Sequence, residues 1–199
     1  MKKILILLVV MVVVGIGASF LIPSVNGTTD LGHINYTETF DQDHSEYYVY
    51  FYQVDCQFCK EFEPHILEAY GDDVPIYVVD VERGKSSLND QAWYDWDLHH
   101  KTHDVVIGEI KDGQQIFNED ESEDLYASEE GWTIGPNPDN ELELIARLNR
   151  ALNNKEPQTA LEIEIAGTPT LIRIKEGRFA GYAEGVEEGI ALLGRFGQE

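Results

Sequence analysis

Residues 48–62 read YVYFYQVDCQFCKEF, and the hydrophobic pattern changes within this stretch. The segment Tyr47–Gln53 is a continuous run of aromatic and β-branched residues, which is typical of a buried strand. From Cys56 onward the apolar residues recur at helical spacing, which predicts a helix over residues 56–70. The apolar face of this helix comprises Cys59, Phe62, Ile66, Leu67 and Tyr70.

Further apolar runs predict the rest of an α/β domain. Val74–Val81 (VPIYVVDV) reads as a second buried strand, so strand, helix and strand form a right-handed βαβ unit with parallel strands. Near the C-terminus, Thr170–Lys175 and Arg178–Ala183 flank the turn signal Glu176-Gly177, which predicts a hairpin. A closing helix is expected to begin near Val186.

A long insertion, at about residues 85–160, separates these two halves. Leu142, Ile145, Leu148 and Leu152 lie at helical spacing and predict a helix that Asp139 or Asn140 would cap. The insertion also holds an acidic stretch without a calcium-loop pattern, which we interpret as a solvated loop.

The insertion also contains an aromatic stretch with two interpretations. Trp93, Tyr94, Trp96 and His99 include residues at helical spacing. Such a stripe is typical of core packing against the sheet, and the alternative is a substrate-recognition cap beside the cysteines.

The N-terminus predicts a membrane segment. Lys2 and Lys3 precede the uncharged run 4–22, which is long enough to span a hydrocarbon core of roughly 30 Å as a helix. We therefore expect a transmembrane signal-anchor at residues 1–23 and a tether and lead-in at 24–45, with the lysines cytoplasmic. The alternative is a cleaved signal peptide that releases the protein after residue 27 or so. In both cases the domain lies outside the cytoplasm, where disulfides persist.

The formal net charge of −23 bears on the class of partner. Nucleic-acid phosphates are bound by Lys and Arg, so we expect no nucleic-acid partner. The charge itself is read as a contribution to solubility.

Cys56 and Cys59 are the only cysteines in the chain. A zinc site needs four ligands, and His99 and His103 would complete such a set only if the insertion folded back over the cysteines. A purely structural disulfide across two residues closes a very short loop and stabilises little. We therefore expect no metal ligands and favour a reactive pair.

The position of the pair between a strand and a helix suits thiol chemistry. Unpaired backbone N–H groups and the positive end of the helix dipole favour a thiolate at Cys56. The thiolate is the attacking species, and Cys59 lies one turn further along, where it can resolve a mixed disulfide. The reverse reaction donates a disulfide to a substrate dithiol.

The order of these motifs resembles the thioredoxin family. A strand, Cys56-Gln57-Phe58-Cys59, a helix and a strand are followed by Gly167-Thr168-Pro169-Thr170, a hairpin and a helix. Pro64, eight residues after Cys56, matches a helix-kinking proline that is frequent in the family. The resemblance covers about residues 46–84 and 160–199, and it implies a thioredoxin-like domain over 46–199 that contains the insertion.

The resemblance also implies the roles of individual residues. Cys56 would be the nucleophile and Cys59 the resolving cysteine. Pro169 would follow a cis peptide bond and pack against the pair, and the backbone of Thr168 would bind an extended substrate. Tyr50 departs from the family, because many members have a buried carboxylate at this position.

The expected function is that of a bacterial, membrane-tethered, extracytoplasmic thiol–disulfide oxidoreductase without a cofactor. Its partners would be the thiols or disulfides of exported proteins and a membrane redox partner that resets the pair. Gln57-Phe58 contains neither histidine nor proline, which favours a less oxidising pair than that of strong disulfide donors. Reductase, oxidase and isomerase all stay open. The alternative is a redox-inactive peptide-binding module of the same fold, or an accessory protein for secretion.

Overall fold

The computed structural model describes residues 31–81 and 92–198. The predicted anchor at 1–23, the first part of the tether and residues 85–91 of the insertion lie outside the described residues. Within the two described ranges, no helix has both the length and the hydropathy that a membrane crossing requires.

A five-stranded mixed sheet contains both of the halves that the sequence predicts. The strand order is β1-β3-β2-β8-β9. β3 runs parallel to both β1 and β2, whereas β8 is antiparallel to β2 and to β9. The strands are β1 (Gly32–His33), β2 (Glu46–Tyr52), β3 (Ile76–Asp80), β8 (Thr170–Lys175) and β9 (Arg178–Glu184). The parallel strand pair and the hairpin are thereby confirmed, and the chain is an α/β protein.

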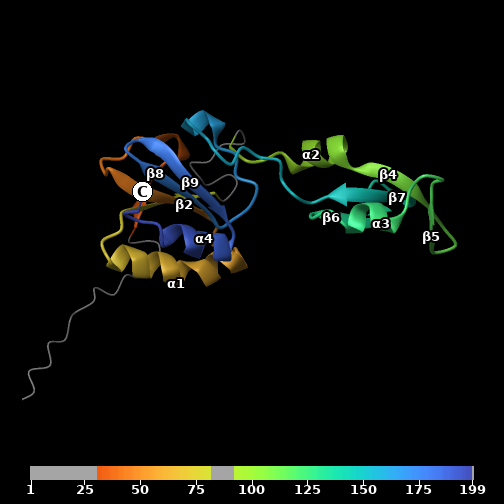
Figure 1. Ribbon diagram of the computed structural model, residues 1–199, viewed down its shortest axis with the longest axis horizontal. Helices are drawn as coiled ribbons and strands as arrows, with labels where there is room; N and C mark the ends of the chain where they lie inside the picture. Colours follow the sequence, from red (N-terminus) through yellow and green to blue (C-terminus); the bar gives the residue numbers. More distant parts are fainter. Residues whose placement is uncertain (1–30, 82–91, 199) are drawn as a thin grey trace, which may run out of the picture.

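Two helices cover one face of this sheet (Figure 1). They are α1 (Gln57–Gly71) and α4 (Val186–Leu193), which begins where the sequence predicts. The buried side chains Phe62 and Ile66 of α1 and Leu192 of α4 share one core cluster with Tyr48 and Tyr50 of β2. The helices approach closely at Gly189, where an added Cβ would lie only 2.6 Å from the Phe62 ring.

Irregular segments cover the opposite face. Val49 and Phe51 of β2 pack there with Tyr36 and Ile163, next to the 3-10 helices η2 (Tyr36–Glu38) and η3 (Ala160–Glu162). Residues 31–45, which the sequence analysis assigned to the tether and lead-in, therefore take part in the fold of this sheet. Leu31 and Tyr36 bury their apolar side chains, and β1 adds a parallel strand to the sheet.

The insertion forms its own antiparallel sheet, which projects to one side of the first (Figure 1). Its strand order is β5-β4-β7-β6. Its core is small and consists of Ile107, Leu144 and Ala146 with neighbouring aromatic side chains. The elements are α2 (Trp96–His103), β4 (Val105–Lys111), β5 (Gln114–Phe117), α3 (Glu123–Ala127), β6 (Trp132–Asn137) and β7 (Asn140–Leu148).

The helix predicted around residues 142–152 is wrong, because residues 142–148 belong to strand β7 and residues 149–152 are in neither helix nor strand. The sequence NELELIARL also alternates at a period of two, so Leu144 and Ala146 lie on one face. Pairing with β4 on one side and β6 on the other satisfies the backbone of β7 and outweighs its helix-favouring composition. Asp139, which the helix prediction placed at a cap, lies in the β6–β7 turn instead.

Candidate functional site

Cys56 caps the N-terminus of α1. Its backbone is extended (φ −72°, ψ 121°), and its Sγ accepts a hydrogen bond from the backbone N–H of Cys59 at 3.1 Å. The N–H of Cys56 donates to the Gln53 carbonyl at 3.3 Å, which closes a turn between β2 and α1. The sulfur therefore faces N–H groups at the helix start, as the sequence predicts.

The loop before β8 lies against this sulfur. The Cys56 thiol donates to the carbonyl oxygen of Thr168 at 3.3 Å, and the Thr168–Pro169 peptide bond is cis, as expected. The antiparallel pairing of β2 with β8, in which Phe51 faces Thr170, holds the two loops together. The structure thus brings together residues that lie more than a hundred positions apart.

The pKa of the Cys56 thiol is lowered. Burial acts to raise it, but hydrogen bonds from the Cys59 thiol, the Thr168 hydroxyl and the backbone N–H groups of Cys59 and Phe58 outweigh that effect. These donors stabilise the thiolate more than the thiol. Cys56 is therefore the more readily ionised thiol of the pair.

Cys59 has the opposite environment. It is only 4% exposed, and burial, together with the nearby Cys56 thiol, raises its pKa to about 11. The two cysteines are reduced in this structure. Cys59 is accordingly held as a protonated thiol, further from solvent than the half-buried sulfur of Cys56.

Tyr50 of β2 contacts Cys59 and occupies the strand position where many members of the thioredoxin family have a carboxylate. Its hydroxyl donates to the Cys59 carbonyl at 3.4 Å, and its side chain is 1% exposed. Burial is the main cause that raises the pKa of Tyr50 far above its ordinary value. Tyr50 therefore stays neutral and cannot serve as a base.

Gln53 also belongs to the site, although it was not among the residues predicted from the sequence. Its side-chain oxygen accepts a hydrogen bond from the Thr168 hydroxyl at 3.2 Å, while its backbone carbonyl binds the N–H of Cys56. Gln53 thereby links the loop before β8 to the turn that holds the cysteine. Its place directly after a buried strand and three residues before Cys56 was the available signal.

A cavity of about 300 Å³ opens beside Cys59 and was also missed. It is lined by residues from the end of β2, the following turn and the first turns of α1. These residues are Tyr50, Tyr52, Gln53, Val54, Cys59, Lys60 and Glu63. A polar side chain, Glu63, and the buried thiol therefore share one solvent-accessible space.

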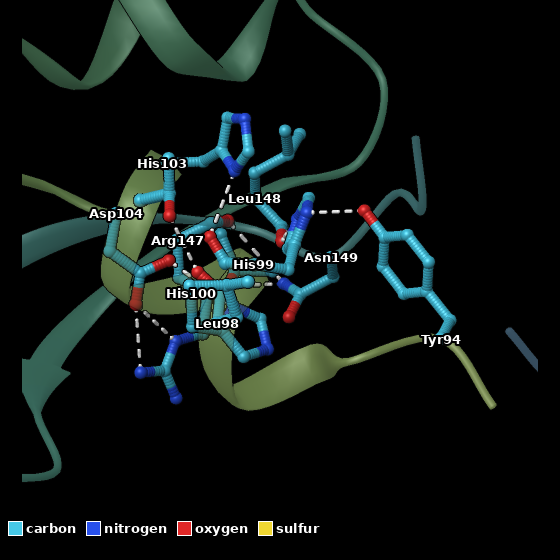
Figure 2. Close-up of polar contacts among 11 residues, drawn as sticks. Tyr94, Leu98, His99, His100, His103, Asp104, Arg147, Leu148 and Asn149 are labelled. Carbon is cyan, nitrogen blue, oxygen red and sulfur yellow. Dashed lines mark hydrogen bonds and ion pairs between the residues drawn. The ribbon is translucent and has the colours of Figure 1, made fainter. Parts of the chain in front are cut away.

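The histidines of the insertion are engaged in a separate network (Figure 2). Nδ1 of His99 lies 2.7 Å from the Tyr94 hydroxyl, and Nε2 lies 2.9 Å from the Leu148 carbonyl. His103 in turn bonds the backbone carbonyl of His99. In residues 31–81 and 92–198, no group of three or more potential ligands is arranged to hold a metal. The zinc alternative therefore has no support from this geometry.

The aromatic stretch packs at the junction between the insertion and the first sheet. Trp93 packs against the core cluster on the helix-free face, and His99 is buried. The indole N–H of Trp96 donates to the Ala166 carbonyl at 2.9 Å, two residues before Thr168. The interpretation as packing against the sheet is thus confirmed for Trp93, whereas His99 is buried within the insertion, against Tyr94 and Leu148.

The site as a whole pairs a half-buried cysteine of lowered pKa with a buried cysteine of raised pKa, beside a cavity of about 300 Å³. Comparison of the chain with protein-family models, with curated proteins and with solved structures found no match. The functional assignment accordingly rests on the residues and geometry described above.

Proposed function

We propose that this protein is an extracytoplasmic thiol–disulfide oxidoreductase that exchanges disulfides with exported proteins through Cys56 and Cys59. The observation that carries the proposal is the asymmetry of the pair. Cys56 lies at a helix N-terminus with a lowered pKa, whereas Cys59 is buried with a raised one. Such an asymmetry separates an attacking sulfur from a resolving one.

We also propose that the first sheet and its two helices form a thioredoxin-like fold. The support is that β2, α1 and β3 form a parallel βαβ unit and that the β8–β9 hairpin extends the same sheet. Helix α4 lies beside α1 on one face of this sheet. The approach of Thr168 to Cys56 matches what the family resemblance implies. The second sheet is an addition between the two halves.

The proposed reaction proceeds in two exchange steps. The Cys56 thiolate attacks a substrate disulfide, forming a mixed disulfide and releasing one substrate thiolate. The Cys59 sulfur then attacks Cys56 Sγ, which forms the Cys56–Cys59 disulfide and releases the second substrate thiolate. The substrate gains two electrons and the protein dithiol loses them. Reversal of both steps oxidises a substrate dithiol.

The surroundings of Cys56 also bear on whether the protein oxidises or reduces its substrates. Its thiolate is stabilised by hydrogen bonds at a helix start, and Gln57 and Phe58 add no positive charge. We therefore propose a reduction potential below that of strong disulfide donors. A membrane-bound dithiol or disulfide protein would reset the pair, with residues 1–23 holding the domain at the membrane.

The reduction potential of the pair tests the redox function. The full-length chain in detergent is equilibrated in glutathione buffers, and its thiols are then alkylated and counted by mass. We expect a reversible two-electron transition between about −270 and −120 mV. The absence of any such transition would overturn the redox function and favour the peptide-binding module.

A trapping experiment identifies the attacking sulfur. With Cys59→Ser, mixed disulfides with exported proteins should accumulate because resolution is blocked, and thiol reagents should release them. The matched Cys56→Ser variant should trap far less, because Cys59 is buried. Equal trapping by both variants would contradict the assignment of roles.

A further inference from the structure

The resolving step poses a problem of proton transfer in this protein. Cys59 must lose its proton before it can attack the mixed disulfide, yet burial raises its pKa to about 11. Tyr50 occupies the adjacent strand position and is itself neutral. The proton therefore needs an acceptor elsewhere in the site.

Glu63 is the carboxylate that shares the cavity with Cys59. It lies four residues after Cys59 on α1, a spacing that places two side chains on the same helix face with Cβ atoms about 5–6 Å apart. Among the causes that raise the pKa of Tyr50, burial and the two cysteines are followed by the negative charge of Glu63. The carboxylate is thus electrostatically close to the tyrosine that bonds the Cys59 carbonyl.

The cavity is large enough to hold the water that would connect these groups. Its volume of about 300 Å³ exceeds the roughly 30 Å³ that one water occupies in the liquid. Four of its lining residues, Tyr50, Tyr52, Gln53 and Glu63, have polar side chains that a water molecule there can bind. Exposed Val54 and Lys60 form its outer rim.

We propose that Glu63 accepts the proton of Cys59, through water in this cavity, when Cys59 resolves the mixed disulfide. This inference rests on the proposed redox function and assigns the residue that completes it. A carboxylate on the helix here would do what a buried carboxylate on the strand does in the resembling family, because Tyr50 leaves the strand position uncharged.

The Cys59 proton passes to water and then to the Glu63 carboxylate, and the Cys59 thiolate attacks Cys56 Sγ. The Cys56–Cys59 bond forms while the bond from Cys56 to the substrate breaks. The electron pair leaves with the substrate sulfur, which takes up a proton from Glu63 or from solvent. The dithiol is oxidised and the substrate disulfide is reduced.

Several other ionisable groups face the cavity or its lining. Lys60 lies on its rim, Tyr50 and Tyr52 line it from β2, and His33 of β1 packs edge-on against the Tyr52 ring. Because several ionisable groups surround the cavity, the pH dependence of a single rate does not identify Glu63. The role of Glu63 is instead identified by comparing the rates of matched variants.

The two exchange steps can be observed separately with an aromatic disulfide, 5,5′-dithiobis(2-nitrobenzoate). Attack by Cys56 releases one coloured thiolate, and resolution by Cys59 releases a second. In stopped-flow measurements on the full-length chain in detergent, we expect Glu63→Gln to slow the second release about 10- to 100-fold near pH 7. The first release should keep its rate, and the difference should narrow as pH approaches the raised pKa of Cys59.

Two variants serve as controls. Glu63→Asp should restore much of the rate, and Glu61→Gln, on an exposed residue of the same helix, should leave both releases unchanged. An unchanged second release in Glu63→Gln would overturn this inference and leave the redox function intact. Equal slowing of both releases would also overturn it, because that result indicates a structural role. If the wild-type protein releases neither thiolate, it is the proposed function itself that fails.

Discussion

The Thr168 hydroxyl should tune the reactivity of Cys56, and Thr168→Val tests this. In the reduced protein the hydroxyl donates to Gln53 at 3.2 Å, and its hydrogen bond also lowers the pKa of Cys56. A hydroxyl has one proton, so ionisation of Cys56 exchanges a neutral hydrogen bond for one to a charged sulfur. A bond to a charged group contributes about 1.5–3 kcal/mol, and a neutral one about 0.5–1.5 kcal/mol.

The difference, about 1 kcal/mol, predicts the size of the effect. Thr168→Val should lower the thiolate population of Cys56 near neutral pH about fivefold. The rate of alkylation by iodoacetamide, measured against pH in a Cys59→Ser background, reports that population. Thr168→Ser should behave like the wild type, and Gln53→Leu should make Cys56 as reactive or more so, because the hydroxyl loses its competing acceptor. An unchanged alkylation rate in Thr168→Val would refute the reasoning.

Two further predictions concern stability. Burial lowers the pKa of His99, so between the lowered pKa and about 6.5 the unfolded chain binds a proton that the folded chain excludes. The contribution of His99 to the free energy of unfolding should therefore be fully present above about pH 6.5 and decline below it. The urea midpoints at pH 8 and pH 5 should differ less in His99→Gln than in the wild type, and an equal difference would contradict this. Gly189→Ala should lower the free energy of unfolding by about 1–2 kcal/mol, because the added methyl group meets the Phe62 ring. Gly194→Ala, where an added Cβ makes ordinary contacts, should change it by less than about 0.5 kcal/mol, and similar urea midpoints for both variants would argue against close helix packing.

The local hydrophobic pattern was sufficient to predict the secondary structure of segments whose pattern fits only one type of element. The run at β2 is buried on both faces, so its continuous apolar character admits a central strand and little else. The helix that follows has a clear period of 3.6, and its N-terminus coincides with Cys56. The lowered pKa of Cys56 could thus be predicted in part, since the N–H groups of Cys59 and Phe58 belong to its own helix start, whereas the Thr168 hydroxyl comes from a distant segment.

Local pattern failed where two periods fit the same residues. In β7, Leu142, Ile145 and Leu148 match a helix, while Leu142, Leu144 and Ala146 match a strand. The available partners, β4 and β6, decide between the two readings. The short strand β1 has no period of its own, and it exists because β3 offers a free parallel edge.

The sequence by itself therefore determined the α/β class and the position of Cys56 at a helix start, and the resemblance to the thioredoxin family predicted that the Thr168-Pro169 segment lies against it. Only the tertiary structure decided the second sheet, the link from Gln53 to Thr168 and the cavity that Glu63 shares with Cys59. The physical reason is the separation along the chain of the residues that determine each feature. Helix starts and buried strands are encoded within a few neighbouring residues, whereas side-chain contacts and cavities arise where segments distant in the chain are packed together.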